Sequence, residues 1–190
     1  MKPKFSLSPF MITPLPSLLL LSIIIFNIST TIVVADLVQK TCKKCENNDP
    51  NINYNFCISS FHAHPGSDTA DLRKLGAISL SLIQKNVSNS FEYVEKLLQN
   101  KEIDSYKKLC LNDCLEVYSN AIDSMEEGKK AYKEKHYNDA NIKVSSVMDA
   151  ARVCEDGFRE KEGVSSPLTK WNKDLFQLAA IALSIINMYP

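Results

Sequence analysis

Six cysteines are the residues of this 190-residue chain best suited to chemistry, and all of them follow residue 41. Cys42 and Cys45 have the C-x-x-C spacing of redox enzymes and zinc sites, while Cys110 and Cys114 would stand one helical turn apart. A redox motif needs a strand that leads into a helix, and a zinc site needs four ligands held together. Strand signals are scarce in this chain, so we expect disulfides, with no metal and no cofactor.

Other kinds of catalytic residue have no recognisable arrangement. The pair His62 and His64 has no third ligand nearby in the sequence, which favours exposed loop residues over a metal site. The chain contains no nucleophile elbow, no phosphate-binding glycine loop and no H-E-x-x-H motif. We therefore expect a protein that binds a partner and is not an enzyme.

Residues 1–35 have the pattern of a secretory signal peptide. Lys2 and Lys4 precede an apolar run that is densest at residues 18–26, and small or medium residues lead to Ala35. A retained membrane anchor is the alternative, because the apolar region approaches the length of a membrane span. Cleavage near Ala35 would export residues 36–190, without a further membrane segment, to an oxidising compartment in which disulfides persist.

The charge of the chain argues against nucleic acid as a partner. There are 22 basic and 22 acidic residues, and loss of Lys2 and Lys4 with the signal leaves a formal charge of −2. No basic stripe and no basic–aromatic alternation follows the signal. The sequon that begins at Asn86 predicts N-glycosylation of an exported chain, and an unmodified residue on a helix face is the alternative.

Four segments after residue 66 carry apolar or small residues at helical spacing. The stripes are Leu72, Gly76, Leu80, Ile83, Val87, Phe91, Val94 and Leu98; Leu111, Cys114, Tyr118, Ala121, Met125, Gly128 and Tyr132; Ala140, Val144, Val147, Ala151, Cys154 and Phe158; and Trp171, Leu175, Leu178, Ala182 and Ile185. A polar turn at 135–139 separates the second from the third, with Asn138 or Asp139 as the expected helix cap. We predict an all-α fold, an up-down-up-down four-helix bundle over 67–190, preceded by a helical hairpin at 36–66.

The helices narrow the fifteen pairings open to six cysteines. A bridge between Cys42 and Cys57 would lock the short hairpin, and one between Cys114 and Cys154 would join the inward stripes of the second and third long helices. A third bridge between Cys45 and Cys110 would tie the hairpin to the bundle. Two free buried thiols, or a link between two molecules, are the alternatives for that last pair.

Several of these segments together resemble the plant invertase and pectin methylesterase inhibitor family. The motifs on which this resemblance rests are Thr41-Cys42-Lys43 with Phe56-Cys57, then Asn112-Asp113-Cys114, and finally Cys154-Glu155-Asp156-Gly157-Phe158. The likeness extends most fully to invertase inhibitors that include tree-pollen allergens, which share the opening Thr41-Cys42-Lys43-Lys44 and the segment from Thr69 to Leu72. Together these segments span almost all of residues 36–190.

The resemblance implies a disulfide-stapled four-helix bundle with an N-terminal helical hairpin, and bridges that pair Cys42 with Cys57 and Cys114 with Cys154. Invertase-directed members carry a Pro-Lys-Phe motif before the helix of the fourth shared cysteine, where this chain has Lys135, His136 and Tyr137. A histidine of ordinary pKa, about 6.5, is mostly cationic at the acidic pH of a plant cell wall, so His136 would offer charge in place of lysine. Tyr137 would fill the aromatic position.

The sequence thus predicts a secreted plant protein that inhibits acid invertase (β-fructofuranosidase) by covering its active-site cleft in a 1:1 complex. Inhibition of pectin methylesterase is the alternative within the family, and a helical carrier of a lipid or other small ligand is the alternative from another class. The expected location is the cell wall or apoplast, with the vacuole as the alternative. A homodimer formed by exchange of the hairpin is compatible with the sequence, and exposure as a pollen allergen follows from the resemblance.

Overall fold

The computed structural model describes residues 37–190, and the predicted signal peptide at 1–35 lies outside the described residues. Within 37–190 the regular structure is helical throughout. Residues 37–48 form a first helix, and the others are α2 (Tyr54–His62), α3 (Leu72–Leu98), α4 (Ser105–Lys133), α5 (Tyr137–Arg159) and α6 (Thr169–Ile186). In this part of the chain no helix combines the length and the apolar character that crossing a bilayer requires.

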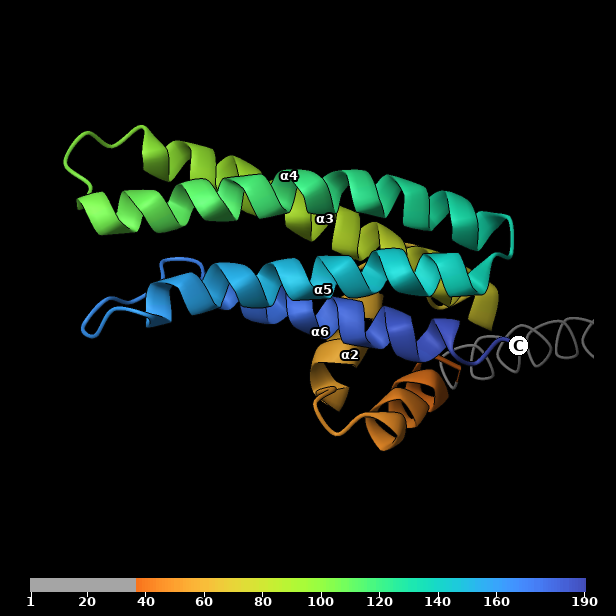
Figure 1. Cartoon of the computed structure of the whole chain (residues 1–190). Coiled ribbons are helices and arrows are strands. Elements are labelled where there is room, and N and C mark those ends of the chain that lie inside the picture. The colour runs from red at the N-terminus through yellow and green to blue at the C-terminus, as the bar shows by residue number, and fades with distance from the viewer. Residues whose placement is uncertain (1–36) are drawn as a thin grey trace, which may run out of the picture.

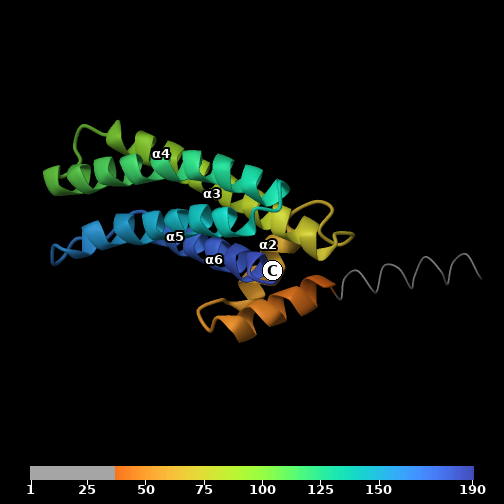
Figure 2. The same cartoon turned by 45° about the vertical axis from the view of Figure 1, so that its right-hand side comes forward.

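The four long helices form the expected antiparallel bundle (Figures 1 and 2). Each of α3, α4, α5 and α6 packs against its neighbours along the chain, and contacts between α3 and α6 close the ring. The connection from α3 to α4 and that from α5 to α6 lie at one end of the bundle. The turn from α4 to α5 lies at the other end, together with the start of α3 and the last residues of the chain. The prediction of an all-α four-helix bundle is therefore confirmed.

Side-chain caps begin three of these helices. The carboxylate of Asp71 accepts a hydrogen bond from the Lys74 amide at 2.7 Å, and the carboxylate of Asp104 accepts from the Tyr106 and Lys107 amides. Asn53 caps α2 in the same way. Such caps satisfy amide groups that have no partner inside the helix, each worth about 1 kcal/mol.

The bundle core consists of the inward stripes read from the sequence. All residues of the second and third stripes are buried, and Tyr118, Met125 and Phe158 have no exposed surface. The α6 helix is buried on more than one side, from Leu175 to Ile186, because it is covered by the bundle on one face and by the N-terminal helices on the other. The interior of the bundle is therefore filled by side chains.

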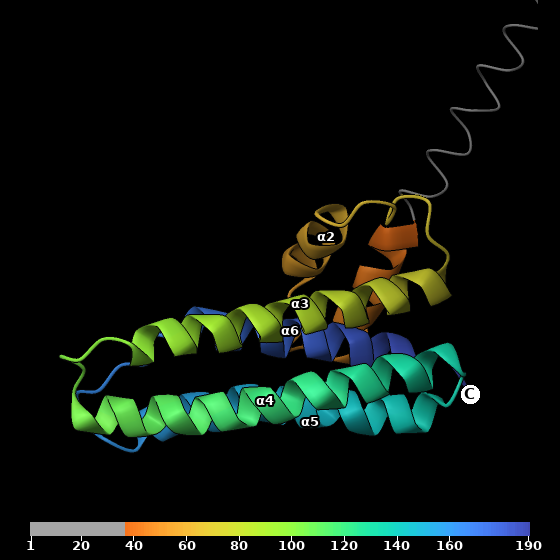
Figure 3. The same ribbon diagram turned by 90° about the horizontal axis from the view of Figure 1, so that it is seen from above.

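The N-terminal helices pack on the outer face of α3 and α6, as the view from above shows (Figure 3). The Cys42–Cys57 disulfide joins residues 37–48 to α2, with the two Cα atoms 5.7 Å apart. Gln177 of α6 fastens the loop between them, because its side-chain amide donates to the Asn51 carbonyl at 2.6 Å and its oxygen accepts from the Asn53 amide at 2.8 Å. The disulfide thus joins the two helices of the hairpin, and the buried Gln177 fastens the hairpin to α6.

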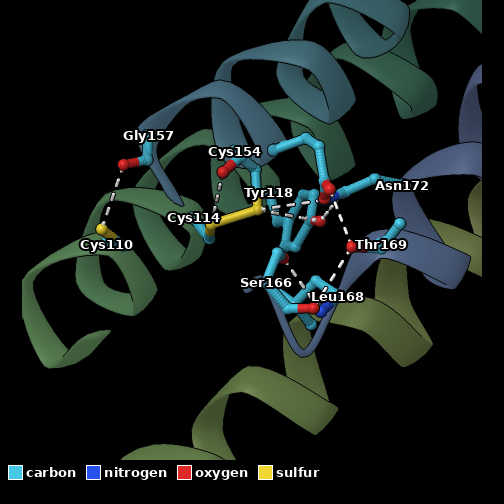
Figure 4. Close-up of a disulfide and its surroundings, with 10 residues drawn as sticks. Cys110, Cys114, Tyr118, Cys154, Gly157, Ser166, Leu168, Thr169 and Asn172 are labelled. Atoms are coloured by element: carbon cyan, nitrogen blue, oxygen red, sulfur yellow. Dashed lines mark hydrogen bonds between the residues drawn. A yellow bond between two sulfur atoms is a disulfide. The ribbon is translucent and has the colours of Figure 1, made fainter. Parts of the chain in front are cut away.

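A second disulfide, Cys114–Cys154, joins α4 to α5 in the bundle core, with Cα atoms 4.8 Å apart (Figure 4). A polar network surrounds it. The Tyr118 hydroxyl donates to the side-chain oxygen of Asn172, and the Asn172 amide donates to Glu155 at 2.8 Å. Burial raises the pKa of Tyr118 well above its ordinary value, so the phenol stays neutral and can donate. The network links α4, α5 and α6 at the level of the bridge.

The expected third bridge is wrong, because Cys45 and Cys110 are both free and buried. Cys45 lies in the cluster beneath the hairpin, beside Ser184 of α6. Cys110 lies in the first turns of α4, in the other core cluster, where its thiol donates to the Gly157 carbonyl of α5 at 3.4 Å (Figure 4). The hairpin covers α3 and α6, whereas Cys110 faces α5, so the two thiols belong to different interfaces. Burial raises the pKa of both thiols.

Candidate functional site

The turn between α4 and α5 contains the residues that the sequence singled out for binding, and its backbone forms a Schellman motif. The His136 amide donates to the Ala131 carbonyl at 2.9 Å, and the Lys135 amide donates to the Tyr132 carbonyl at 3.1 Å. Lys135 occupies the left-handed position of this motif, with φ of 66°. Glycine is the usual residue there, since a side chain adds strain. The strain thus lies at an exposed residue of the turn.

His136 occupies the N-cap position of α5, and the expected cap by Asn138 or Asp139 is wrong. The His136 carbonyl accepts from the Ala140 amide at 3.0 Å, and no side chain caps the helix. The imidazole is 63% exposed, and its Nδ1 lies 3.8 Å from a carboxylate oxygen of Glu134. Glu134 thus lies within ion-pair distance of the imidazole.

Tyr137 is half-buried and held by two other tyrosines. Its ring stacks on Tyr189 with centroids 4.6 Å apart and meets the Tyr132 ring edge-on at 5.5 Å. Tyr132 and Tyr189 also meet edge-on, at 6.4 Å. Burial raises the pKa of both supporting phenols. This three-tyrosine cluster joins the end of α4, the start of α5 and the residues that follow α6.

Tyr132 is fixed by a contact with α3. Its hydroxyl donates to the Arg73 carbonyl at 3.1 Å, and it lies so close to Gly76 that a Cβ atom at that position would be 2.0 Å from the phenol oxygen. Gly76 is therefore required for the tyrosine to cross from α4 to α3. Arg73 adds a second link between these helices, because its guanidinium donates to the Lys133 carbonyl at 3.0 Å.

The exposed side of the turn borders a hollow of about 350 Å³, lined by residues 135–139 and by Pro190. The turn presents the exposed basic side chains of Lys135 and His136 on a backbone that the tyrosine cluster and the Schellman motif hold in place. Within residues 37–190 no group of three or more metal-ligating side chains could hold a metal ion. The arrangement is suited to contact with another molecule.

Sequence reasoning found Lys135, His136 and Tyr137 but missed their supports, Tyr189 and Arg73. Tyr189 follows the last helix, where no periodicity draws attention to it, and Arg73 reads as an ordinary exposed helix residue. The sequence signal for this cluster was the position of Tyr132, Tyr137 and Tyr189 at the ends of three different helices. Asn86, the residue of the sequon, lies in the middle of α3 and is half-buried, with its side-chain oxygen out of contact with water.

Comparison with known proteins agrees with this fold. Residues 36–185 match the profile of the family described as plant invertase/pectin methylesterase inhibitor. The chain is 44% identical over 157 residues to the "Putative invertase inhibitor" of Platanus acerifolia, an alignment that covers 83% of this chain and 87% of the relative. It is 29% identical over 154 residues to the pectinesterase inhibitor of Actinidia deliciosa, over 81% and 80% of the two chains.

A solved structure leads to the same family. The crystal structure of mutant form A of a pectin methylesterase inhibitor from Arabidopsis superposes with a TM-score of 0.65 at 25% identity, over 76% of this chain and 97% of that one. The profile and the relatives cover nearly the whole of the described bundle and hairpin. The chain therefore belongs to the plant invertase/pectin methylesterase inhibitor family.

Proposed function

We propose that this protein is exported to the plant cell wall and inhibits an acid invertase, with the turn Lys135-His136-Tyr137 placed in the mouth of the enzyme's active-site cleft. The observation that carries the proposal is the construction of the turn: exposed Lys135 and His136 stand beside a Tyr137 that Tyr132 and Tyr189 hold rigidly. Binding through a surface that is already rigid costs less conformational entropy than binding through a loop that must first become ordered. Two disulfides support the same rigidity.

The charge of the turn also suits this target. Glycosidases use a pair of carboxyl groups to hydrolyse sugars, so their active-site clefts favour the binding of positively charged side chains. The Platanus relative is named for invertase, and an Arabidopsis relative, 29% identical over 79% of this chain and 82% of its own length, is named a cell wall/vacuolar inhibitor of fructosidase. The apoplast is therefore the proposed location, with the vacuole as the alternative.

The test is inhibition of purified cell-wall invertase at acidic pH by the secreted, oxidised protein, with pectin methylesterase assayed in parallel. Replacement of Lys135 and His136 by alanine should weaken invertase inhibition about tenfold or more, since one exposed charge contact at a cleft is worth on the order of 1 kcal/mol. Lys108→Ala, an exposed lysine at the far end of α4, is the matched control. Unchanged potency of the double variant would remove the turn from the mechanism.

Pectin methylesterase is the second candidate target, favoured by the structural neighbour and by the Actinidia relative. In that case wild-type protein would inhibit the esterase and leave invertase untouched. The carrier of a small apolar ligand is not proposed, because the space between the four helices is occupied by buried side chains such as Tyr118, Met125 and Phe158. Glycosylation at Asn86 stays a prediction, which the mass of the secreted protein would test.

A further inference from the structure

A groove of about 950 Å³ is lined by residues from the first turns of α3 and the last turns of α4, and it shares Tyr132 with the tyrosine cluster. Figure 3 shows these two helix ends side by side. Its lining residues are Asp71, Arg73, Lys74, Ala77, Leu80, Ser81, Lys129, Lys130, Tyr132, Lys133 and Glu134. We call it the α3/α4 groove. Five of these residues are basic and two are acidic, in a chain whose basic and acidic residues are equal in number.

The positive charge of the groove is only partly offset from within. Asp71 and Glu134 stay acidic while they contact the Lys74 amide and His136, so the five basic residues leave a formal excess of three positive charges. None of the ion pairs among residues 37–190 involves any of the four lysines that line the groove. All four are exposed. A cleft with an excess of unpaired charges of one sign concentrates ligands of the opposite charge.

Fold stability explains only part of this placement of charge, namely the Arg73 bond to α4 and the lysines at the end of α4. Arg73 and Lys74 lie in the first turn of α3, where the helix dipole disfavours cations. Lys129 and Lys133 stand four residues apart on α4, a spacing at which like charges repel. Only the lysines of the last turn of α4 are favoured by that helix's dipole. The positions of Lys74 and Lys129 are therefore unfavourable to the helices that carry them.

The shape of the groove selects among anions. Its lining also includes the exposed Ala77 and the nearly covered Leu80 and Tyr132, and the Arg73 guanidinium of α3 donates to the Lys133 carbonyl of α4. A ring sugar that bears a carboxylate can lay its C–H face on the apolar part of this lining and present its charge to the lysines. A chain of such sugars is stiff, so it loses less entropy on binding than a flexible acidic peptide of equal charge.

We propose that the α3/α4 groove is a binding site for an anionic polysaccharide built from uronic acids. The site is separate from the turn Lys135-His136-Tyr137, and its occupation requires no target enzyme. Carboxyl groups of ordinary pKa, near 4, are largely ionised at mildly acidic pH, while the lysines stay charged. Binding should therefore persist at pH 5 and weaken as salt screens the exposed charges.

The test is a calorimetric titration of the whole secreted protein with an unesterified oligogalacturonate at pH 5. The titration is performed at low and at high salt. The paired variant Lys74→Glu with Lys129→Glu should weaken binding at least about tenfold, the effect of roughly one lost charge contact. Both substitutions suit their helices, because an acidic side chain at position 74 would follow the Asp71 cap in the first turn, and one at position 129 would stand four residues before Lys133. The melting temperature should therefore be unchanged or higher, which separates lost binding from lost folding.

The matched control is Lys107→Glu with Lys108→Glu, an equal change of charge at the other end of α4, and it should bind as the wild type does. The fully methyl-esterified oligomer, which is uncharged, should not bind. The proposal is overturned by any of three results: wild-type protein that does not bind the charged oligomer, equal binding by the Lys74/Lys129 variant, or equal binding of the esterified form. Tighter binding of poly-glutamate of matched charge would overturn it in favour of an acidic protein partner.

Discussion

At the scale of single residues, Lys135 is the clearest case of local strain next to a candidate binding surface. Its φ of 66° places an L-amino acid in the left-handed region, at the position of the Schellman motif that glycine normally occupies. Non-glycine residues adopt that conformation at a cost of about 1 kcal/mol. A strained residue beside an exposed surface motivates the hypothesis that the lysine is retained for contact with a partner.

Lys135→Gly should therefore stabilise the protein by about 1 kcal/mol and raise the midpoint of thermal unfolding by about 2–4 °C. Urea unfolding of the secreted protein would measure the change. Lys133→Gly is the matched control, and it should be destabilising by about 1 kcal/mol because it lies in the last turn of α4. A Lys135→Gly variant no more stable than the wild type would contradict the strain. Invertase inhibition should fall in the same variant.

Gly76 allows a second prediction at this scale. A methyl group on Gly76 would meet the Tyr132 hydroxyl at 2.0 Å and Ile185 at 3.2 Å, so Tyr132 must move and the contact between α3 and α4 must loosen. Gly76→Ala should destabilise the fold by about 1–3 kcal/mol, as overpacked cores do. Gly157→Ala in α5 is the matched control, since no atom lies within 4 Å of the added carbon, and it should stabilise by up to about 1 kcal/mol. Denaturant melts of the two variants should move in opposite directions.

At the scale of elements, the hairpin depends on its staple more than the bundle does. The α2 helix has nine residues and contacts only α3 and α6 among the long helices, and helices of that length are marginal alone. The Cys42–Cys57 bridge spans a separation of 15 residues, which corresponds to about 3 kcal/mol in the chain-entropy account. Gln177 and the buried cluster around Phe61 supply the remaining contacts.

Replacement of Cys42 and Cys57 by alanine should therefore release residues 37–62 while the four long helices stay folded. Hydrogen exchange followed by mass spectrometry should show fast exchange in the hairpin and unchanged protection in α4 and α5. Replacement of Cys114 and Cys154 is the comparison, and it should lower protection throughout the bundle, because that bridge joins α4 to α5 in the core. Uniform loss of protection in the hairpin variant would argue against a separable element.

At the scale of the whole molecule, buried neutral acids link stability to alkaline pH. Burial raises the pKa values of Tyr118, Tyr132 and the free thiol of Cys45, while the unfolded chain keeps ordinary values near 10 for tyrosine and 8.5 for cysteine. Above those values the unfolded state has lost protons that the folded state retains. The stabilisation is therefore complete below about pH 8.5 and is lost as the pH rises toward the folded pKa values.

The free energy of unfolding should be flat from neutrality to about pH 8.5 and then fall, with each buried tyrosine adding a slope of about 1.4 kcal/mol per pH unit above pH 10. Tyr118→Phe should have a shallower slope in that range, and at neutral pH it should be about 1 kcal/mol less stable because the bond to Asn172 is lost. Urea melts across a pH series would measure both effects. An equal alkaline slope in the variant would show that Tyr118 ionises freely.

The sequence by itself determined the helices and the faces they bury, because helical periodicity is a local property. The stripe from Leu111 to Tyr132 and that from Ala140 to Phe158 are buried at every position. Motifs spread along the chain identified the family, and the turn at 135–137 was located from the same alignment of segments. Each stripe and each motif depends on residues close together in the chain.

Tertiary structure alone decided how separate helix ends combine. Cys45 and Cys110 fit a third bridge by elimination, but the hairpin packs on α3 and α6 while Cys110 faces α5, so the thiols never meet. The tyrosine cluster and the α3/α4 groove join residues some 50 to 60 positions apart, and no pattern within one helix encodes them. Contacts between distant segments follow from packing of the whole chain, which local propensity does not specify.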